Sequence, residues 1–111
     1  MESIIALTLG DPAGIGPEII VKAFQDELLS VDNQILVIGD AELLKKTAKQ
    51  IAPEIFIHSV TSPKKGWYKT CTIDVIDLKN VSETLPMGRP SAEGGKASYE
   101  AIQKAVELAL K

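Results

Sequence analysis

Residues 4–18 are Ile4-Ile5-Ala6-Leu7-Thr8-Leu9-Gly10-Asp11-Pro12-Ala13-Gly14-Ile15-Gly16-Pro17-Glu18. An apolar run leads into a glycine-rich loop, and an amphipathic segment follows, so the pattern predicts a buried strand, a tight turn and a helix. Glycine allows the backbone to approach another group closely, and Pro17 suits the first helical position. In α/β proteins, ligands are held by turns of this kind, because the first N–H groups of a helix are free to bind an anion.

The spacing of the loop glycines leaves two interpretations open. Gly10, Gly14 and Gly16 follow the pattern G-x-x-x-G-x-G. This is not the G-x-G-x-x-G of a Rossmann fingerprint, and the Lys-Ser/Thr pair of a P-loop is absent. The loop therefore either faces a cofactor or an anionic substrate, or is a strand-to-helix turn that binds nothing.

The rest of the chain predicts an α/β domain with a largely parallel sheet and right-handed crossovers. Strands are expected at 4–9, 35–38, 55–58 and 72–78, and helices at 16–29, 41–51 and 91–111. The continuous apolar character of 4–9 predicts a strand covered on both faces. The partial alternation at 72–78 predicts a strand near a sheet edge, with one face in water.

Each helix has an apolar stripe that is expected to pack inward. The stripes comprise Ile19, Ile20, Ala23, Phe24 and Leu28; Leu43, Leu44, Ala48 and Ile51; and Ala97, Ala101, Ile102, Ala105, Leu108 and Ala109. Ser91 is the expected N-cap of the last helix. Gly94 and Gly95 should each cost ~1 kcal/mol relative to alanine. They indicate either close approach of a backbone or ligand, or tight helix–helix packing, which is the simpler interpretation.

Four other residues have both a structural and a functional interpretation, and Cys71 has a structural one only. Asp40 follows a strand and is expected to cap the next helix, with ribose binding as the alternative. His58 is expected to be structural, with ligand binding as the alternative. Trp67 and Tyr68 are expected to pack in the core, with a binding platform as the alternative. Cys71 is expected to be a small buried or strand residue.

Composition excludes several classes of function. The 111 residues carry a net charge of −3, which gives no footprint for nucleic acid or an anionic membrane. No stretch approaches the ~18 apolar residues of a membrane helix, and Glu2 argues against a signal peptide, so we expect a cytoplasmic protein. One cysteine and one histidine supply neither a disulfide nor a metal site.

Two motifs, in the same order along the chain, resemble one enzyme family. Residues 8–18 resemble the amino-terminal signature of the 4-hydroxythreonine-4-phosphate dehydrogenases of pyridoxal phosphate biosynthesis, and Gly88-Arg89-Pro90-Ser91-Ala92-Glu93-Gly94-Gly95-Lys96-Ala97 resembles a later segment of the same family. The shorter core of the first motif also resembles the isopropylmalate and isocitrate dehydrogenases. The resemblance implies their fold, with residues 1–111 as an amino-terminal fragment of about a third of a family member.

The resemblance also implies an activity for the full-length protein. A homodimer would oxidise 4-phosphooxy-threonine with NAD, and the product would then lose carbon dioxide; the divalent metal, such as zinc, would be held by histidines beyond this chain. Gly10, Asp11, Gly14, Ile15 and Gly16 match the loop that borders the cofactor cleft, and no catalytic or metal-binding residue is assigned. One alternative is a dehydrogenase for another phosphorylated four-carbon hydroxy acid, such as phosphothreonate. Another is a non-catalytic binding module that dimerises through its alanine-rich helix.

Overall fold

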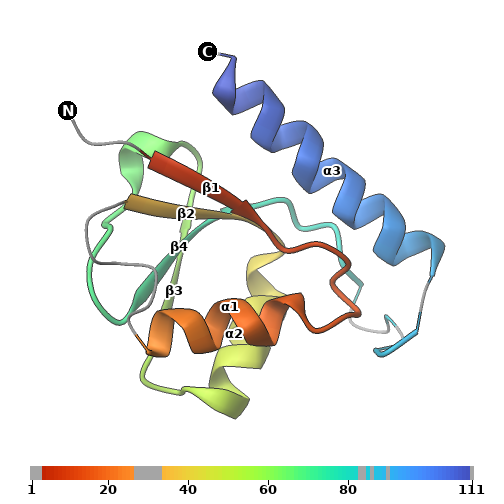
Figure 1. Ribbon diagram of the computed structural model, residues 1–111, viewed down its shortest axis with the longest axis horizontal. Coiled ribbons are helices and arrows are strands. Elements are labelled where there is room, and N and C mark those ends of the chain that lie inside the picture. Colours follow the sequence, from red (N-terminus) through yellow and green to blue (C-terminus); the bar gives the residue numbers. More distant parts are fainter. Residues whose placement is uncertain (1–3, 27–33, 83–84, 86, 90, 111) are drawn as a thin grey trace.

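The computed structural model describes residues 4–26, 34–82, 85, 87–89 and 91–110. Within these ranges four parallel strands form one sheet in the order β1-β2-β4-β3 (Figure 1). The strands are β1 (Ile4–Thr8), β2 (Gln34–Gly39), β3 (Phe56–Val60) and β4 (Thr72–Asp77). The helices are α1 (Gly16–Gln25), α2 (Ala41–Ile51) and α3 (Ala92–Ala109), with a short 3-10 turn, η1 (Pro63–Lys65). The predicted α/β class and element order are confirmed.

The sheet separates two apolar layers, because successive side chains of a strand point to opposite faces. One layer joins the sheet to α1 and α2, and its buried members include Ile20, Val21, Val37, Leu44, Ala48, Ile57, Ile73 and Val75. The other layer joins the sheet to α3, and its buried members are Leu36, Ile38, Val60, Ile76 and Ala101. Helices α1 and α2 therefore cover one face, and α3 covers the opposite face.

Two strand predictions were wrong about position in the sheet. β1 is an edge strand, so Ile4 and Ile5 are each 41% exposed instead of being covered on both faces. β4 lies between β2 and β3, and its residues from Thr72 to Ile76 are all buried. The alternation at 72–78 arises from Asp74, whose buried carboxylate is satisfied by hydrogen bonds rather than by water.

Helices α1 and α2 begin at the predicted residues. α2 matches its predicted bounds, and Leu44 and Ala48 are buried as expected. In α1, Ile20 is buried as predicted, but Ile19 is 55% exposed, whereas Val21 is fully buried. The inward face is therefore rotated by one residue relative to the predicted stripe. Leu28 lies outside the described residues.

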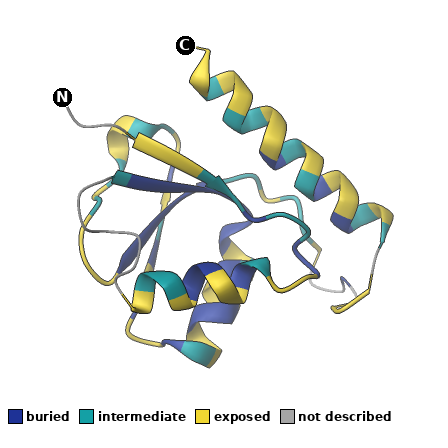
Figure 2. Cartoon of the chain, viewed as in Figure 1, coloured by how far each residue is buried: buried dark blue, intermediate teal, exposed yellow. Residues whose placement is uncertain are grey.

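Helix α3 packs on the sheet, against β1 and β2, and not on another helix of the described chain. Ala97 and Ala101 are buried as predicted. Ile102 and Ala109 were predicted to face inward, but both are exposed. Figure 2 shows this long exposed side of α3. Within the described chain, the small residues Ala97 and Ala101 therefore face the sheet and not another helix.

Candidate functional site

The predicted loop lies at the carboxyl end of β1 and is braced by Asp11. The amide of Ala13 donates to Asp11 Oδ1 at 2.8 Å, and the amide of Gly14 donates to the Asp11 carbonyl at 2.9 Å. Gly10 has a φ of 71°, a conformation that residues with a side chain rarely adopt. The chain therefore turns sharply after β1 and is held in that turn by one side chain.

Two glycines of the loop region have close contacts. A Cβ on Gly16 would lie 2.3 Å from the carbonyl oxygen of Leu9, so only glycine lets α1 begin this close to the end of β1. A Cβ on Gly94 would lie 2.5 Å from Asp11 Oδ1. The neighbour at Gly94 is therefore the Asp11 side chain, and not the backbone, ligand or second helix that the sequence suggested. Gly95 has nothing within 4 Å of its would-be Cβ.

The two sequence motifs meet in space. The first turn of α3 lies on Asp11, and the amide of Gly88 donates to the carbonyl of Ala13 at 2.7 Å. Ser91 caps α3 as predicted, since its hydroxyl accepts from the Gly94 amide at 3.0 Å. Loop 10–16 and the start of α3 therefore form one unit.

A hollow of about 480 Å³ opens between these segments. It is lined by Asp11, Ala13, Gly14, Ile15, Glu18, Met87, Gly88 and Arg89. Of the five predicted cofactor-side residues, Asp11, Gly14 and Ile15 line the hollow, whereas Gly10 and Gly16 shape the loop behind it. Ile15 is 71% exposed and presents apolar surface to the hollow.

The hollow combines hydrogen-bond donors with two carboxylates, since Asp11 and Glu18 line it together with Arg89. α1 begins at Gly16 without a side-chain cap, so the amides of Gly16 and Glu18 keep their donor capacity, whereas Pro17 has no N–H. Arg89 adds an exposed guanidinium, which binds phosphate and carboxylate groups in a bidentate geometry. Arg89 was not predicted as a site residue. The sequence feature that could have indicated Arg89 is the preceding glycine. Gly88 has a φ of 76°, which turns the chain toward the loop.

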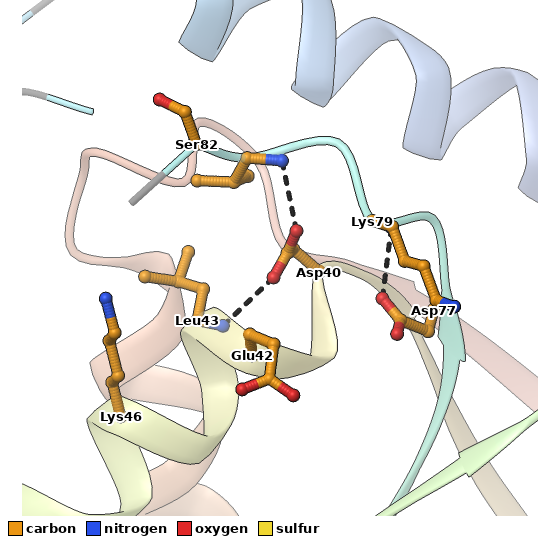
Figure 3. A pocket seen from close by; sticks show the side chains of 8 residues that line it. Asp40, Glu42, Leu43, Lys46, Asp77, Lys79 and Ser82 are labelled. Atoms are coloured by element: carbon orange, nitrogen blue, oxygen red, sulfur yellow. Dashed lines mark hydrogen bonds between the residues drawn. The ribbon is translucent and has the colours of Figure 1, made fainter. Parts of the chain in front are cut away.

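A second hollow, of about 300 Å³, lies at the carboxyl ends of β2 and β4 (Figure 3). Asp40 accepts hydrogen bonds from the amides of Leu43 and Val81, both at 3.0 Å. Asp77 Oδ1 accepts from the amides of Ala41 at 3.1 Å and Lys79 at 3.0 Å. The predicted N-cap role of Asp40 is confirmed, and both carboxylates hold main-chain segments together.

His58 belongs to a surface cluster around the buried carboxylate of Asp74. His58 Nδ1 lies 2.7 Å from Asp74 Oδ1, and the amides of Trp67 and Tyr68 donate to the same carboxylate at 2.9 and 2.8 Å. These contacts agree with the structural interpretation of His58. The Trp67 ring stacks on the His58 ring with centroids 3.5 Å apart.

The predictions of core packing for Trp67 and of burial for Cys71 were wrong. Trp67 is 50% exposed, because its backbone is tied to Asp74 and its ring lies over His58 at the surface. Tyr68 is partly buried against the α3-side layer, and its hydroxyl donates to the Pro63 carbonyl at 2.6 Å. Cys71 is exposed and lies just before β4, with a φ of 58° that turns the chain into the strand.

Within the described ranges, no group of three or more His, Cys, Asp or Glu side chains is placed to hold a metal ion. The same ranges contain no helix that combines the length and the hydropathy needed to cross a lipid bilayer.

Comparison with known proteins identifies the family. The sequence model of the family described as pyridoxal phosphate biosynthetic protein PdxA matches residues 31–111. A Fusobacterium nucleatum protein, provisionally named a D-threonate 4-phosphate dehydrogenase, is 42% identical over 112 residues, which cover 99% of this chain and 33% of the relative. The D-threonate 4-phosphate dehydrogenase of Cupriavidus necator is 35% identical over 105 residues, which cover 95% of this chain and 32% of that enzyme.

A solved structure agrees with these sequence matches. The 4-hydroxythreonine-4-phosphate dehydrogenase of Burkholderia phymatum superposes with a TM-score of 0.92 at 36% identity, over 99% of this chain and 33% of that one. The chain therefore spans about a third of the length of the relatives it matches. Since the family model covers most of the chain, the protein belongs to the PdxA family.

Proposed function

We propose that the full-length protein is an NAD-dependent dehydrogenase of a phosphorylated four-carbon hydroxy acid, and that this chain supplies one wall of its cofactor cleft. The observation that carries the proposal is the hollow in which loop 10–16 of a PdxA-family chain meets Arg89. In open α/β sheets, ligands bind beyond the carboxyl ends of the strands, and this loop follows the carboxyl end of β1.

The residues around the hollow fit a dinucleotide. The amides of Gly16 and Glu18 and the guanidinium of Arg89 are donors that a pyrophosphate could accept from. The exposed Ile15 side chain offers apolar surface to a flat ring. Gly14 suits the tight turn, because a Cβ at residue 14 would lie only 3.3 Å from the Asp11 carbonyl oxygen. NAD, when bound, supplies the hydride acceptor.

A divalent metal such as zinc belongs to the same proposal, but its ligands lie elsewhere in the full-length protein. The described part of this chain has no suitable donor cluster. A bound metal ion would polarise the substrate hydroxyl. This chain's contribution is therefore cofactor binding, and the isolated residues 1–111 are expected to be inactive. Homodimeric assembly and a cytoplasmic location stay predictions.

The names of the relatives support two substrates. The curated relatives are named for D-threonate 4-phosphate, and the solved structure is named for 4-hydroxythreonine 4-phosphate. For the second, oxidation at C3 gives a β-keto acid, which then loses carbon dioxide. Both molecules carry a phosphate and a carboxylate on four carbons.

The experiment is a direct comparison of the two substrates with the full-length protein. NADH formation is followed by absorbance with NAD, a divalent metal and each compound in turn, and kcat/KM decides the natural substrate. Absence of NADH with both compounds would contradict the dehydrogenase proposal. Isolated residues 1–111 serve as the negative control.

Truncation of Ile15 tests the role of the loop. Ile15→Ala removes an exposed side chain, so folding should be unaffected, and the loss of ~1–2 kcal/mol of apolar contact should raise KM for NAD about tenfold. Ile19→Ala is the matched control, since Ile19 is 55% exposed one turn further along α1 and does not line the hollow. Equal KM values for NAD in the two variants would contradict a contact between Ile15 and the cofactor.

The alternative of a non-catalytic module that dimerises through its alanine-rich helix stays a prediction. Ala97 and Ala101 of α3 are buried against the sheet, so a second copy would have to contact other residues of this helix.

A further inference from the structure

The open edge of β3 lies at the end of the sheet opposite to β1. β3 pairs with β4 on one side, and the described chain places no strand on its other side. The amide of Phe56 donates to the carbonyl of Cys71 at 2.8 Å, so Phe56 turns its peptide groups toward β4. Because successive residues of a strand turn their N–H and C=O groups to alternate sides, Ile57 and Ser59 turn theirs to the open edge. These groups form a row with which an extended peptide can pair.

A groove of about 200 Å³ lies beside this edge, between β3 and α2. It is lined by Lys45, Ala48, Lys49, Pro53, Ile55, Phe56 and Ile57, so only its two lysines are polar. Phe56 is 55% exposed, and its ring stacks on the Trp67 ring with centroids 5.7 Å apart. The groove therefore offers apolar contact to the side chains of a strand that pairs with the edge.

Exposed lysines surround the β3 edge. They are Lys45 and Lys49 on α2, Lys64 and Lys65 in η1, which follows β3, and Lys69, whose Nζ lies 4.6 Å from the centroid of the Trp67 ring. Within the described ranges, Lys45 is the only one of the five that pairs with a carboxylate, that of Glu42 at 3.2 Å. Glu54, just before β3, accepts a hydrogen bond from Gln25 at 3.1 Å. This edge is therefore cationic, although the whole chain carries a net charge of −3.

The charge of the edge decides which partner fits it. Two copies that paired edge to edge about a twofold axis would bring the same lysines together, which is unfavourable. Carboxylates on an extended peptide would instead meet the lysines with the opposite charge. We propose that the β3 edge binds an acidic, extended segment of another polypeptide by strand addition. Its backbone pairs with Ile57 and Ser59, and its apolar side chains enter the groove.

Amide exchange of β3 in the full-length protein measures this pairing. The probe is an N-acetylated heptapeptide of alternating glutamate and valine, and the matched control is a heptapeptide of alternating lysine and valine. With the acidic probe at about ten times its Kd, the amides of Ile57 and Ser59 should exchange about tenfold more slowly. Added salt should weaken this protection. Absence of protection at millimolar acidic probe, or equal protection by the basic peptide, would overturn the proposal.

Two variants test strand pairing and charge separately. Ser59→Pro removes an outward N–H and leaves the pairing with β4 intact, so the acidic probe should no longer protect Ile57. Lys49→Glu reverses a charge in the groove and should raise the Kd of the acidic probe about fivefold. The control is Lys22→Glu, at an exposed lysine of α1 outside the groove, and its Kd should not change. Full protection of Ile57 in the proline variant, or equal Kd values in the two glutamate variants, would contradict the proposal.

Exchange in the protein without probe tests the other occupants of the edge. The amides of Ile57 and Ser59 should exchange fast, at a rate that does not depend on protein concentration. Slow exchange at every concentration would show that another part of the full-length chain covers the edge. Protection that increases with concentration would show pairing with a second copy, and either result overturns the proposal. None of these measurements uses activity, so their outcome is independent of the proposed dehydrogenase function.

Discussion

The carboxylate of Asp11 lies directly against the backbone of Gly94. A Cβ at residue 94 would be 2.5 Å from Asp11 Oδ1 and 3.0 Å from its Cγ. The same Oδ1 accepts the hydrogen bond from the Ala13 amide that shapes the loop. The first turn of α3 therefore limits where the Asp11 side chain can lie, and through it the form of loop 10–16.

Gly94→Ala should distort the loop. The added methyl group must displace Asp11, which breaks its hydrogen bond to Ala13 and costs about 1–3 kcal/mol of unfolding free energy. The matched control is Gly95→Ala, where nothing lies within 4 Å, and it should stabilise the helix by ~0.5–1 kcal/mol. Urea unfolding of the full-length variants measures both. Equal free energies of unfolding for the two variants would show that the Asp11 side chain moves aside without cost.

Asp74→Asn should loosen the segment before β4. The carboxylate is 1% exposed and accepts from His58 and from the amides of Trp67 and Tyr68. An amide nitrogen in place of one oxygen leaves a buried donor facing donors, which costs about 1–3 kcal/mol. Amide exchange at residues 66–71 should accelerate. Glu42→Gln, at a carboxylate that is 75% exposed, is the control and should change neither exchange nor stability. Unchanged exchange in the Asp74 variant would contradict the anchoring role.

Local patterns were sufficient to predict the elements. Periodicity and capping residues placed α2 at its observed bounds and identified Asp40 and Ser91 as caps, because these features depend on neighbouring residues alone. The loop between β1 and α1 was also predictable, since glycines and prolines restrict the backbone locally. The close approach at Gly94 was indicated by a pair of glycines where a helix would normally exclude them.

Predictions that depend on distant residues were the ones that were wrong. The apolar run of β1 indicates burial, but its exposure depends on which strands lie beside it. Asp74 suggested a wet strand face, whereas it is buried because the Trp67 and Tyr68 amides reach it from a separate segment. Arg89 was missed because its place beside the loop depends on the bond between Gly88 and Ala13.

Tyr68 should ionise at a higher pH than an ordinary tyrosine. Burial raises its pKa above the ordinary value of 10.0, and the nearby negative charge of Asp74 adds to the rise. Because the folded pKa is raised, the stabilising contribution is fully present below pH 10 and is lost as the pH increases through the folded pKa. The difference in phenolate absorbance between the full-length protein and Tyr68→Phe isolates this titration. The control variant Tyr99→Phe should retain the change in phenolate absorbance above the ordinary pKa, because Tyr68 is still present. A difference spectrum centred at or below the ordinary pKa would contradict the assignment.

Glu93 should hold the segment after β4 against α3 down to unusually low pH. Its carboxylate accepts from the amide of Ser82 and from the Ser82 hydroxyl, and these bonds lower its pKa from the ordinary value of 4.5. Because the folded pKa is depressed, the contribution of the pair is present above pH 4.5 and is lost as the pH falls through the folded pKa. Slow exchange of the Ser82 amide should therefore persist below pH 4.5. It should disappear only when the pH falls to the lowered pKa of Glu93. Glu93→Gln should remove this acid transition, and Glu107→Gln, at an exposed carboxylate further along α3, should retain it. An acid transition that survives in the Glu93 variant would show that another group holds Ser82 in place.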